Sequence, residues 1–354
     1  MTQVPFAVAI ELDGEGAHPA AALAGDGARA LSARRVAETA LAAERHGFTA
    51  VTFEDSPLPD GAVARLDAVQ RAAYVAPLTS GIGLLPVVSV AFSEPFHVAT
   101  QLASVDYASE GRAGWIVRAA GDASEAAAYG RAAIDDPAEV RREADDAIEV
   151  ARRLWDSWQD DAVVRDVATG RYLDADRLHY ADFEGASYSV KGPSIIPRPP
   201  QGQLVVAAGH AGDVDIVLVS APDEDGVAAR ATAAREEGAG RVLAEIEYLL
   251  DSRGVTASDR LAALDARAVW EPGPRLRHVG DAAGLAALIA RLAHVVDGVR
   301  LHPAVLDPDL DEAGRAVIPA LRESLAFRSP VAGATLRETL GLRRPANRYE
   351  RSVA

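Results

Sequence analysis

Four polar residues able to take part in binding or proton transfer stand in segments that follow apolar stretches predicted to be β-strands. In chain order they are His18, Asp55, Ser89 and His210. An imidazole, a carboxylate or a hydroxyl at such a place can bind a ligand by hydrogen bonds or exchange a proton with it. For His18 the alternative is a surface histidine ahead of Pro19, and for Asp55 it is a helix cap or a loop acid.

The elements that must position these residues are predicted from hydrophobic spacing. Apolar stretches predict strands at 6–12, 49–53, 81–88, 111–117, 204–208, 214–220, 241–249 and 298–302. Helical spacing and cap residues predict helices at 31–46, 65–75, 94–108, 137–158, 222–237, 284–292 and 315–327. The segment 251–279 is interpreted as a short polar connection.

The longest irregular stretch runs from 159 to 202, between the helix that ends at Trp158 and the strand at 204–208. About 40 residues is far longer than an ordinary connection, and such loops are usually functional or disordered. This one holds Tyr172, Tyr180, Phe183 and Tyr188. We therefore expect a packed excursion, with Gly209 opening a ligand loop after the strand that follows.

Composition excludes several classes of function. The chain has 354 residues, 49% of them apolar, and a formal net charge of −16. An acidic surface argues against nucleic acid or an anionic membrane as partner. The absence of cysteine removes thiolate metal sites and cysteine nucleophiles. Neither a leader sequence nor an 18-residue apolar run is found, so we expect a cytoplasmic protein.

Motif searches add further exclusions. The sequence has no Gly-x-Gly-x-x-Gly after a strand, no P-loop, no Gly-x-Ser-x-Gly and no zinc-spaced histidine pair. The acidic run 307–311 fails the EF-hand pattern, because Glu312 and Ile318 stand where Gly and Glu are required. Nothing indicates a hydrolase, a kinase or a metalloenzyme.

A set of short motifs resembles the bacterial-luciferase-like flavin monooxygenases, in the branch of nitrilotriacetate, dibenzothiophene-sulfone and long-chain-alkane monooxygenases. The matching pieces are Leu154-Trp-Asp-Ser-Trp158, Glu94-Pro-Phe-His97, Gly111-Arg-Ala-Gly-Trp115 and the tail 336–347. The resemblance covers nearly the whole chain. It implies a single (β/α)8 barrel over 1–354 that uses reduced FMN from a separate flavin reductase, most often as a homodimer. A deazaflavin coenzyme is the alternative cofactor.

The resemblance also assigns residues to the flavin. It places Asp55 beside the flavin, a hydroxyl such as Ser89 facing the isoalloxazine, and Tyr129 at the phosphate; Trp115, Gly209 and His210 belong to the same cofactor-contacting segments. One departure is Ile116, where close relatives carry Asn. Ile116 has no side-chain hydrogen bond to offer, so that flavin contact is lost unless Arg118 replaces it.

A second departure concerns the flavin phosphate. Relatives follow the strand at 204–208 with serines and a helix whose N-terminus binds the phosphate. Here only Gly209-His-Ala-Gly-Asp213 precedes the next strand, so this barrel helix is predicted to be missing. A parallel crossover usually takes ten to twelve residues or more. We therefore expect either a distorted barrel wall or a displaced strand, with His210 left as one phosphate ligand.

Two functions follow from these observations. The first is a monooxygenase that oxygenates a small organic substrate with reduced FMN and O2, using His18 and Asp55 as catalytic residues. The second is a paralogue with a degenerate flavin site, acting as a non-catalytic partner subunit or small-molecule binder. Ile116 and the missing helix favour the second function. The first function is favoured because the resemblance implies an enzyme of a type that often binds reduced flavin weakly.

Overall fold

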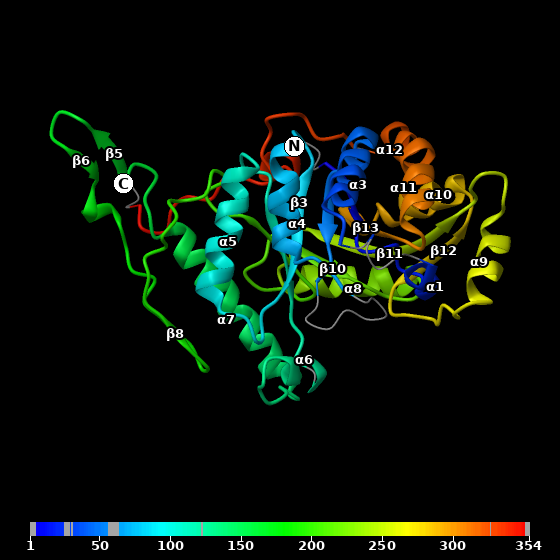
Figure 1. Ribbon diagram of the computed structural model, residues 1–354, viewed down its shortest axis with the longest axis horizontal. Coiled ribbons are helices and arrows are strands. Elements are labelled where there is room, and N and C mark those ends of the chain that lie inside the picture. The colour runs from blue at the N-terminus through cyan, green and yellow to red at the C-terminus, as the bar shows by residue number, and fades with distance from the viewer. Residues whose placement is uncertain are drawn as a thin grey trace.

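The computed structural model describes residues 5–24, 29, 31–55, 64–121, 123–325 and 327–350. Within them, parallel strands form one sheet in the order β10-β9-β4-β3-β2-β1-β13-β11-β12, and β10 also pairs with β11 (Figure 1). That last pairing closes eight strands into a barrel, with β12 (Leu276–Gly280) added outside it. The barrel strands are β1 (Ala7–Glu11), β2 (Ala50–Phe53), β3 (Gly83–Ser89), β4 (Gly114–Arg118), β9 (Val205–Ala208), β10 (Ile216–Val219), β11 (Val242–Leu250) and β13 (Gly298–Pro303). The predicted (β/α)8 barrel is confirmed.

Alternate residues of each strand face opposite sides, which sorts the core into two parts. The barrel interior holds mostly small or medium apolar side chains, among them Ala7, Ala9, Ala50, Val87, Ile116 and Ala207. The outward row packs under the helices and includes Val8, Ile10, Trp115, Val117 and Val206. An eight-stranded barrel is just wide enough for side chains to fill its interior, and small residues fit there without overpacking.

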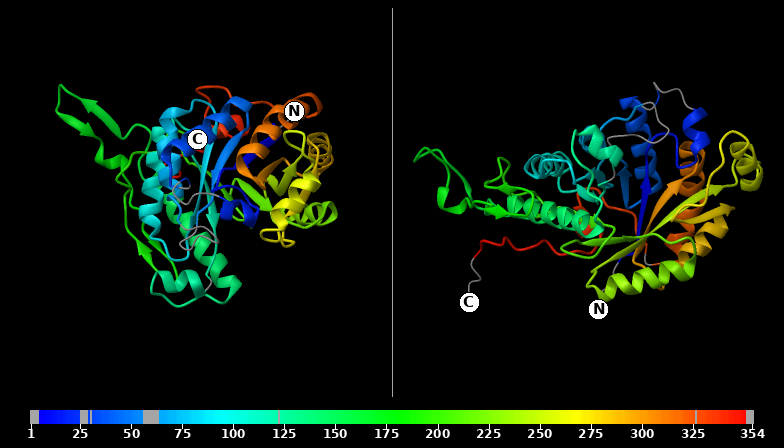
Figure 2. Two further views of the ribbon diagram at one scale, coloured as in Figure 1. Left: turned by 45° about the vertical axis from the view of Figure 1, so that its right-hand side comes forward. Right: turned by 90° about the horizontal axis from the view of Figure 1, so that it is seen from below.

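Helices cover the outside of the barrel (Figures 1 and 2). Their bounds are α1 (Pro19–Ala24), α3 (Ala33–His46), α4 (Ala68–Val75), η1 (Ala76–Leu78), α5 (Pro95–Ala108), α6 (Ala123–Ala128), α7 (Pro137–Asp156), α8 (Glu224–Glu236), α9 (Ala257–Asp265), α10 (Ala282–Leu292), α11 (Leu306–Glu312), η3 (Ala313–Val317), α12 (Ile318–Ser324) and α13 (Leu336–Thr339). Predicted helix signals are found at α3, where Gly47 takes φ 87°, and at α7, where Asp136 accepts from the backbone N–H of Ala138. Within the described residues, no helix is both long and apolar enough to span a bilayer.

Two sequence assignments need correction in the C-terminal third. The segment 251–279 is not a simple connection, because it contains α9 and β12. The last barrel helix begins at Leu306, nine residues earlier than the predicted start at Arg315, and continues through α11, η3 and α12. The acidic run 307–311 is thus the first part of a helix, where acids favour the positive end of the helix dipole.

The connection between β9 and β10 contains no helix, as the sequence predicts. Neither strand is displaced, however: Ile216 lies level with Ala207, and both strands belong to the closed barrel. The strand begins at Ile216 rather than Val214, and each of the two strands has four residues. The chain therefore returns by only roughly 10 Å, which the loop 209–215 can span without a helix.

Asp215 fastens this short connection to the barrel. Its backbone N–H donates to Val206 O at 2.8 Å, and its Oδ2 accepts from the backbone N–H of Val206 at 2.9 Å. The Asp215 carboxylate also pairs with Arg337 at 2.9 Å and with Arg152 at 3.4 Å. These bonds hold the start of β10 against β9 in the absence of a crossover helix.

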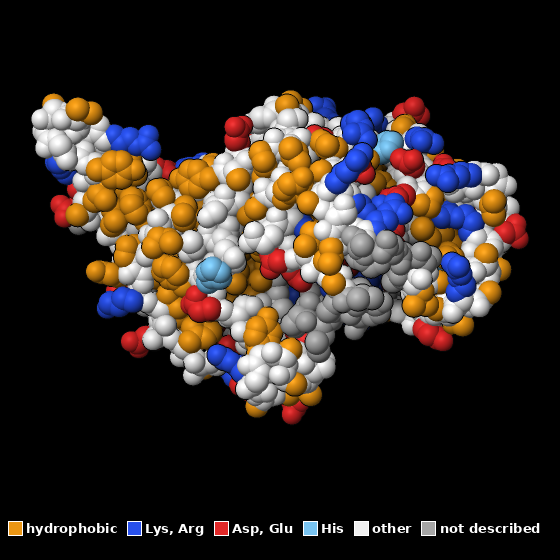
Figure 3. All heavy atoms as spheres, in the orientation of Figure 1, with side chains coloured by type: hydrophobic (Ala, Val, Ile, Leu, Met, Phe, Trp, Pro, Cys, Tyr) orange, Lys and Arg blue, Asp and Glu red, His pale blue; other side chains and the backbone are white. Residues whose placement is uncertain are grey.

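The predicted excursion after α7 forms two small hairpins, β5–β6 (Val163–Asp166 and Arg171–Leu173) and β7–β8 (Phe183–Glu184 and Ser189–Val190), with η2 (Ala175–Arg177) between them. The β5–β6 hairpin projects from the barrel, and the C-terminal tail extends in the same direction (Figures 1 and 2). Hydrophobic side chains gather over this side of the molecule and over α5 and α7 (Figure 3). Trp158 Nε1 donates to Ser194 O at 2.7 Å, which ties the two ends of the excursion together.

Candidate functional site

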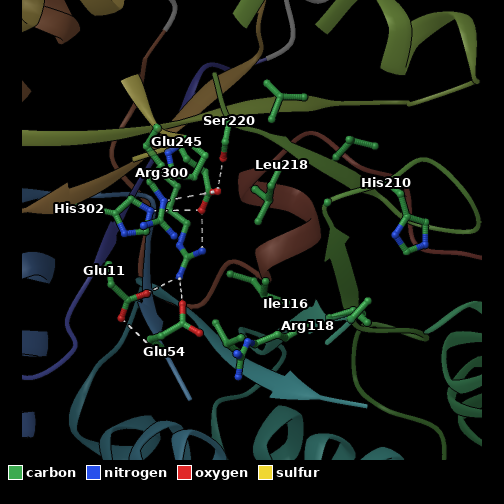
Figure 4. Close-up of a pocket in the computed structure, with 18 of the residues that line it drawn as sticks. Glu11, Glu54, Ile116, Arg118, His210, Leu218, Ser220, Glu245, Arg300 and His302 are labelled. Atoms are coloured by element: carbon green, nitrogen blue, oxygen red, sulfur yellow. Dashed lines mark hydrogen bonds and ion pairs between the residues drawn. The ribbon is translucent and has the colours of Figure 1, made fainter. Parts of the chain in front are cut away.

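A cavity of about 1040 Å³ opens at the carboxyl ends of the barrel strands (Figure 4). Part of its charged lining comes from the barrel strands: Glu11 of β1, Glu54 after β2, Arg118 of β4, Glu245 and Glu247 of β11, and Arg300 and His302 of β13. These residues continue the inward rows of the strands above the small apolar residues of the interior. The barrel therefore has an apolar floor and a charged mouth.

Arg300 is the centre of the charged mouth. Its Nε donates to Thr52 Oγ1 at 3.0 Å and its Nη1 to Glu245 Oε1 at 2.8 Å. Its Nη2 pairs with Glu11 and lies 3.4 Å from Glu54 Oε2. The guanidinium is only 3% exposed, so these partners are what makes a buried charge tolerable here.

Glu245 is shared by several donors. His302 Nε2 donates to its Oε1 at 3.2 Å, and the Ser220 hydroxyl donates to its Oε2 at 2.6 Å. Arg275 approaches the same carboxylate at 3.7 Å and also reaches Glu247 at 3.6 Å. Both oxygens of the Glu245 carboxylate accept hydrogen bonds, and these bonds orient the donor side chains around it.

Burial and charge move the pKa values of this group in different directions. Burial opposes ionisation of Glu11 and Glu245, but Arg300 and His302 hold both pKa values below the ordinary value. Burial prevails at Glu54 and raises its pKa. Burial, helped by Arg275 and Arg300, lowers the pKa of His302 to about 4. His302 is therefore neutral at pH 7. Burial also raises the pKa of Asp13, which lines the cavity, but Asp13 is paired with Arg65 and Arg71. Glu54 is thus the better placed of the two cavity carboxyls to exchange a proton.

The opposite end of the cavity is formed by the β9–β10 loop. Gly209, His210 and Ala211 line it, and Ile116 and Leu218 lie between His210 and the Arg300 group (Figure 4). An ideal Cβ built on Gly209 would meet no atom within 4 Å, so the backbone faces open space there. The cavity thus has an apolar middle between two polar ends.

Three predicted site residues meet in one network beside the cavity. Arg118 lines the cavity and pairs with the buried Glu125 at 2.5 Å, and its Nη1 donates to Asp55 O at 3.3 Å. The Ser89 hydroxyl donates to the same Glu125 at 3.2 Å. The Asp55 carboxylate itself accepts from the backbone N–H of Ala68 at 2.7 Å. Arg118 is therefore the member of this group that reaches the cavity.

Gly209 and His210 line the cavity as well, and His210 Nε2 lies 2.9 Å from Asp145 Oδ1. His18 lies elsewhere: its side chain is fully buried and is not among the cavity-lining residues. His18 Nδ1 accepts from the backbone N–H of Ala20, and Nε2 donates to Asp265 at 3.1 Å. Its ring also packs on Trp270, with centroids 5.1 Å apart, and burial lowers its pKa.

Trp115 and Tyr129 are placed away from the cavity lining. Trp115 belongs to the outward row of β4 and packs edge-on against Trp155 of α7, with ring centroids 6.4 Å apart. Tyr129 follows α6, is 46% exposed and packs against Phe92 at 5.7 Å.

Sequence reasoning missed Glu11, Glu54 and Glu245, which bind or face Arg300. The signal was present, because Glu11 is the one charged residue of its strand, and Glu245 and Glu247 are the two charged residues of theirs. A charge in a buried strand needs a partner. Among the residues that the structure describes, no group of three or more His, Asp or Glu side chains is arranged to hold a metal ion.

Comparisons with known proteins agree with the fold. The family model described as luciferase-like monooxygenase matches residues 13–315. N-acetyl-S-(2-succino)cysteine monooxygenase of Bacillus subtilis (strain 168) is 37% identical over 161 residues, which is 45% of this chain and 36% of the relative. Nitrilotriacetate monooxygenase component A of Aminobacter aminovorans is 36% identical over 138 residues, 39% of this chain and 30% of the relative. The aligned stretches thus span about a third of these relatives' length.

Structural similarity extends over nearly the whole chain. A riboflavin lyase, solved with modified FMN and the substrate riboflavin, superposes with a TM-score of 0.81 over 97% of both chains. Its sequence is 21% identical, so this likeness concerns the fold.

Proposed function

Because the chain belongs to the luciferase-like monooxygenase family, we propose that it oxygenates a small organic substrate with O2 and reduced FMN supplied by a separate reductase. The observation that carries the proposal is the cavity of about 1040 Å³ at the carboxyl ends of the barrel strands. In (β/α)8 enzymes the active site lies at that face. Bound reduced flavin would supply the electrons and the reaction with oxygen, and the protein would supply position and exclusion of water.

The residues of the cavity fit a flavin in size and chemistry. Its volume suffices for the ring system and a small substrate together. Ile116 and Leu218 offer apolar surface to the rings, Gly209 leaves space beside the backbone, and Arg118 presents hydrogen-bond donors. We assign Arg118, Gly209 and His210 to the cofactor, with Asp55 and Ser89 supporting Arg118 through the network around Glu125.

The charged mouth would serve the substrate side of the reaction. Arg300 fixes Glu11 and Glu245 as carboxylates, so neither is free to act as an acid at neutral pH. Glu54 lines the cavity with a raised pKa and can hold or release a proton at its Oε2. We therefore assign proton exchange with the substrate to Glu54, and the positioning of its carboxyl to Arg300.

A second candidate function is a non-catalytic partner subunit or small-molecule binder with a degenerate flavin site. Ile116 contributes no polar group at a place where relatives carry Asn, and no helix follows β9 to receive a phosphate. Both observations weaken flavin binding without closing the cavity. The two functions differ in one property, namely whether reduced flavin reacts differently when the protein is present.

The distinguishing experiment mixes the protein and reduced FMN anaerobically and then admits ¹⁸O2. A monooxygenase site shelters reduced flavin from solvent. The rate of flavin reoxidation should therefore differ from that of free flavin, and the difference should grow with the fraction of flavin that is bound. Small sulfides, sulfones, amino-carboxylates and alkanes would then be screened for incorporation of one ¹⁸O atom. Reoxidation that superimposes on that of free flavin at saturating protein would leave the partner-subunit function as the better account.

A further inference from the structure

Three nitrogen-bearing side chains from outside the barrel strands line the cavity. Arg141 comes from α7, Arg230 from α8 and His210 from the β9–β10 loop. Arg141 donates to Ala211 O in the connection from which the crossover helix is missing. Arg230 stands about two turns before Glu237 on the α8 side of the cavity, and the Glu237 carboxylate lies 3.7 Å from Arg141. The cavity lining is therefore cationic in part, although the chain as a whole carries a net charge of −16.

The two arginines are not committed to strong partners. Arg230 is exposed, and its side chain makes no hydrogen bond or ion pair with any residue that the structure describes. Arg141 Nη2 donates to Ala211 O at 2.8 Å and lies 3.7 Å from Glu237 Oε2. Both members of the Arg141–Glu237 pair are about half exposed, and such pairs contribute little. Most of the guanidinium donors here remain available to a ligand.

The loop adds backbone donors, and its residues Gly209, His210 and Ala211 line the same cavity. Among the described residues, none accepts a hydrogen bond from the backbone N–H of His210, Ala211 or Gly212. Gly209, just before them, leaves open space where a side chain would stand. Free N–H groups in a short loop, together with arginine, are the groups that bind phosphate in proteins.

We propose that Arg141, Arg230 and the 209–212 loop form the binding site for the phosphate monoester of the flavin, in place of the missing helix N-terminus. The proposal rests on the proposed function, since it concerns the same cavity. Two carboxylates face the site, Glu237 beside Arg141 and Asp145 on His210. Without a ligand, the Glu237 carboxylate is the weakly held anion beside Arg141. A phosphate carries more charge and more acceptor oxygens, so it displaces Glu237 from Arg141.

The test compares FMN with riboflavin, which differ only in the phosphate. Anaerobic titrations would measure the affinity of both reduced flavins for the wild type and for Arg141→Gln/Arg230→Gln. The double variant should bind FMN at least about tenfold more weakly, because charge-assisted bonds are lost, and riboflavin within about twofold of the wild type. Glu237→Gln should strengthen FMN binding alone. Inorganic phosphate should compete with FMN and not with riboflavin.

Two variants serve as controls. Arg142→Gln removes the same charge one residue away, from a side chain of equal exposure that does not line the cavity, and should leave both affinities unchanged. Tyr129→Phe removes the hydroxyl that the family resemblance assigns to the phosphate. A preference for FMN that survives the double substitution, or is lost in Tyr129→Phe instead, overturns this inference and leaves the proposed function standing. Absence of saturable binding of either flavin overturns both.

Discussion

Arg300 of β13 and Glu245 of β11 stand directly opposite each other in the strand register, and Arg300 Nη1 donates to Glu245 Oε1 at 2.8 Å. Both side chains are buried, at 3% and 9% exposure. Because a one-residue slip of either strand would turn one of these side chains out of the barrel, the pair links strand alignment to the geometry of the mouth. The ion pair in the site therefore also helps to hold β11 and β13 in register within the closed barrel.

Replacing Arg300 by Met should destabilise the protein severely. Arg300→Met leaves Glu11, Glu54 and Glu245 without their shared cation in a buried setting, and breaking a buried ion pair costs about 3–5 kcal/mol. Urea unfolding followed by circular dichroism would measure the free energy of unfolding. Arg34→Met is the matched control, because Arg34 forms an exposed helical pair with Glu38 and should cost less than about 0.5 kcal/mol. A loss below 1 kcal/mol for Arg300→Met would show that the mouth does not depend on this cation.

His302 should make stability depend on pH between about 6.5 and 4. Burial holds the pKa of folded His302 at about 4, whereas an unfolded histidine titrates near 6.5. In that window the unfolded chain binds the additional proton, so the free energy of unfolding falls as the pH falls. His302→Gln keeps a donor toward Glu245 and removes the titration. The wild type should lose up to about 1.4 kcal/mol per pH unit more than His302→Gln in this window. Parallel pH curves for the two proteins would contradict the assignment.

Asp215 should be required for stable pairing of β9 and β10, which are joined by a connection without a helix. Asp215→Ala removes the acceptor of the Val206 backbone N–H and leaves the buried Arg337 without its carboxylate, at an expected cost of about 3–5 kcal/mol. Asp213→Ala is the control, since Asp213 is 66% exposed and contacts the neighbouring Arg152. Thermal unfolding of both variants would check this, and equal melting temperatures would rule out a special role for Asp215.

The strands, the helix caps and the missing crossover were accessible from the sequence because they are local features, and the closed (β/α)8 barrel was implied by the family resemblance. The helix-free loop 209–215 is confirmed for that reason. The roles of α9 and β12 were missed because their short polar pattern is stabilised by distant contacts, such as Trp270 packing on His18. Local spacing carries no information about a partner some 250 residues away.

The site was only partly predictable for a similar reason. Inward and outward positions alternate, so Ile116 enters the cavity whereas the adjacent Trp115 packs under α7, and motif matching treats both alike. The location of His18 depends on Asp265, which lies far along the chain. Arg118, Gly209 and His210 could be predicted to lie at the cavity because each stands at the carboxyl end of a barrel strand, and in this fold those ends face the cavity.

Restoring the polar group of the relatives should strengthen flavin binding. Ile116→Asn adds a side chain able to donate to and accept from the flavin, and one such bond contributes about 0.5–1.5 kcal/mol, or roughly threefold to tenfold in affinity. Without flavin the buried amide lacks a partner, so the variant should be less stable than Ile116→Val. Melting temperatures with and without reduced FMN would measure this, and a flavin-induced rise no greater than that of Ile116→Val would speak against a flavin at Ile116.

The most direct test of the account is an anaerobic titration with reduced FMN of the wild type and of Gly209→Phe. The Gly209 backbone is not in the left-handed region, and a Cβ meets nothing within 4 Å, so a phenyl ring should enter the cavity without unfolding the protein. We expect saturable binding by the wild type, and binding at least about tenfold weaker in a variant that melts within a few degrees of it. Absence of saturable binding by the wild type at millimolar flavin, or equal binding by both proteins, would contradict a flavin site in the barrel mouth.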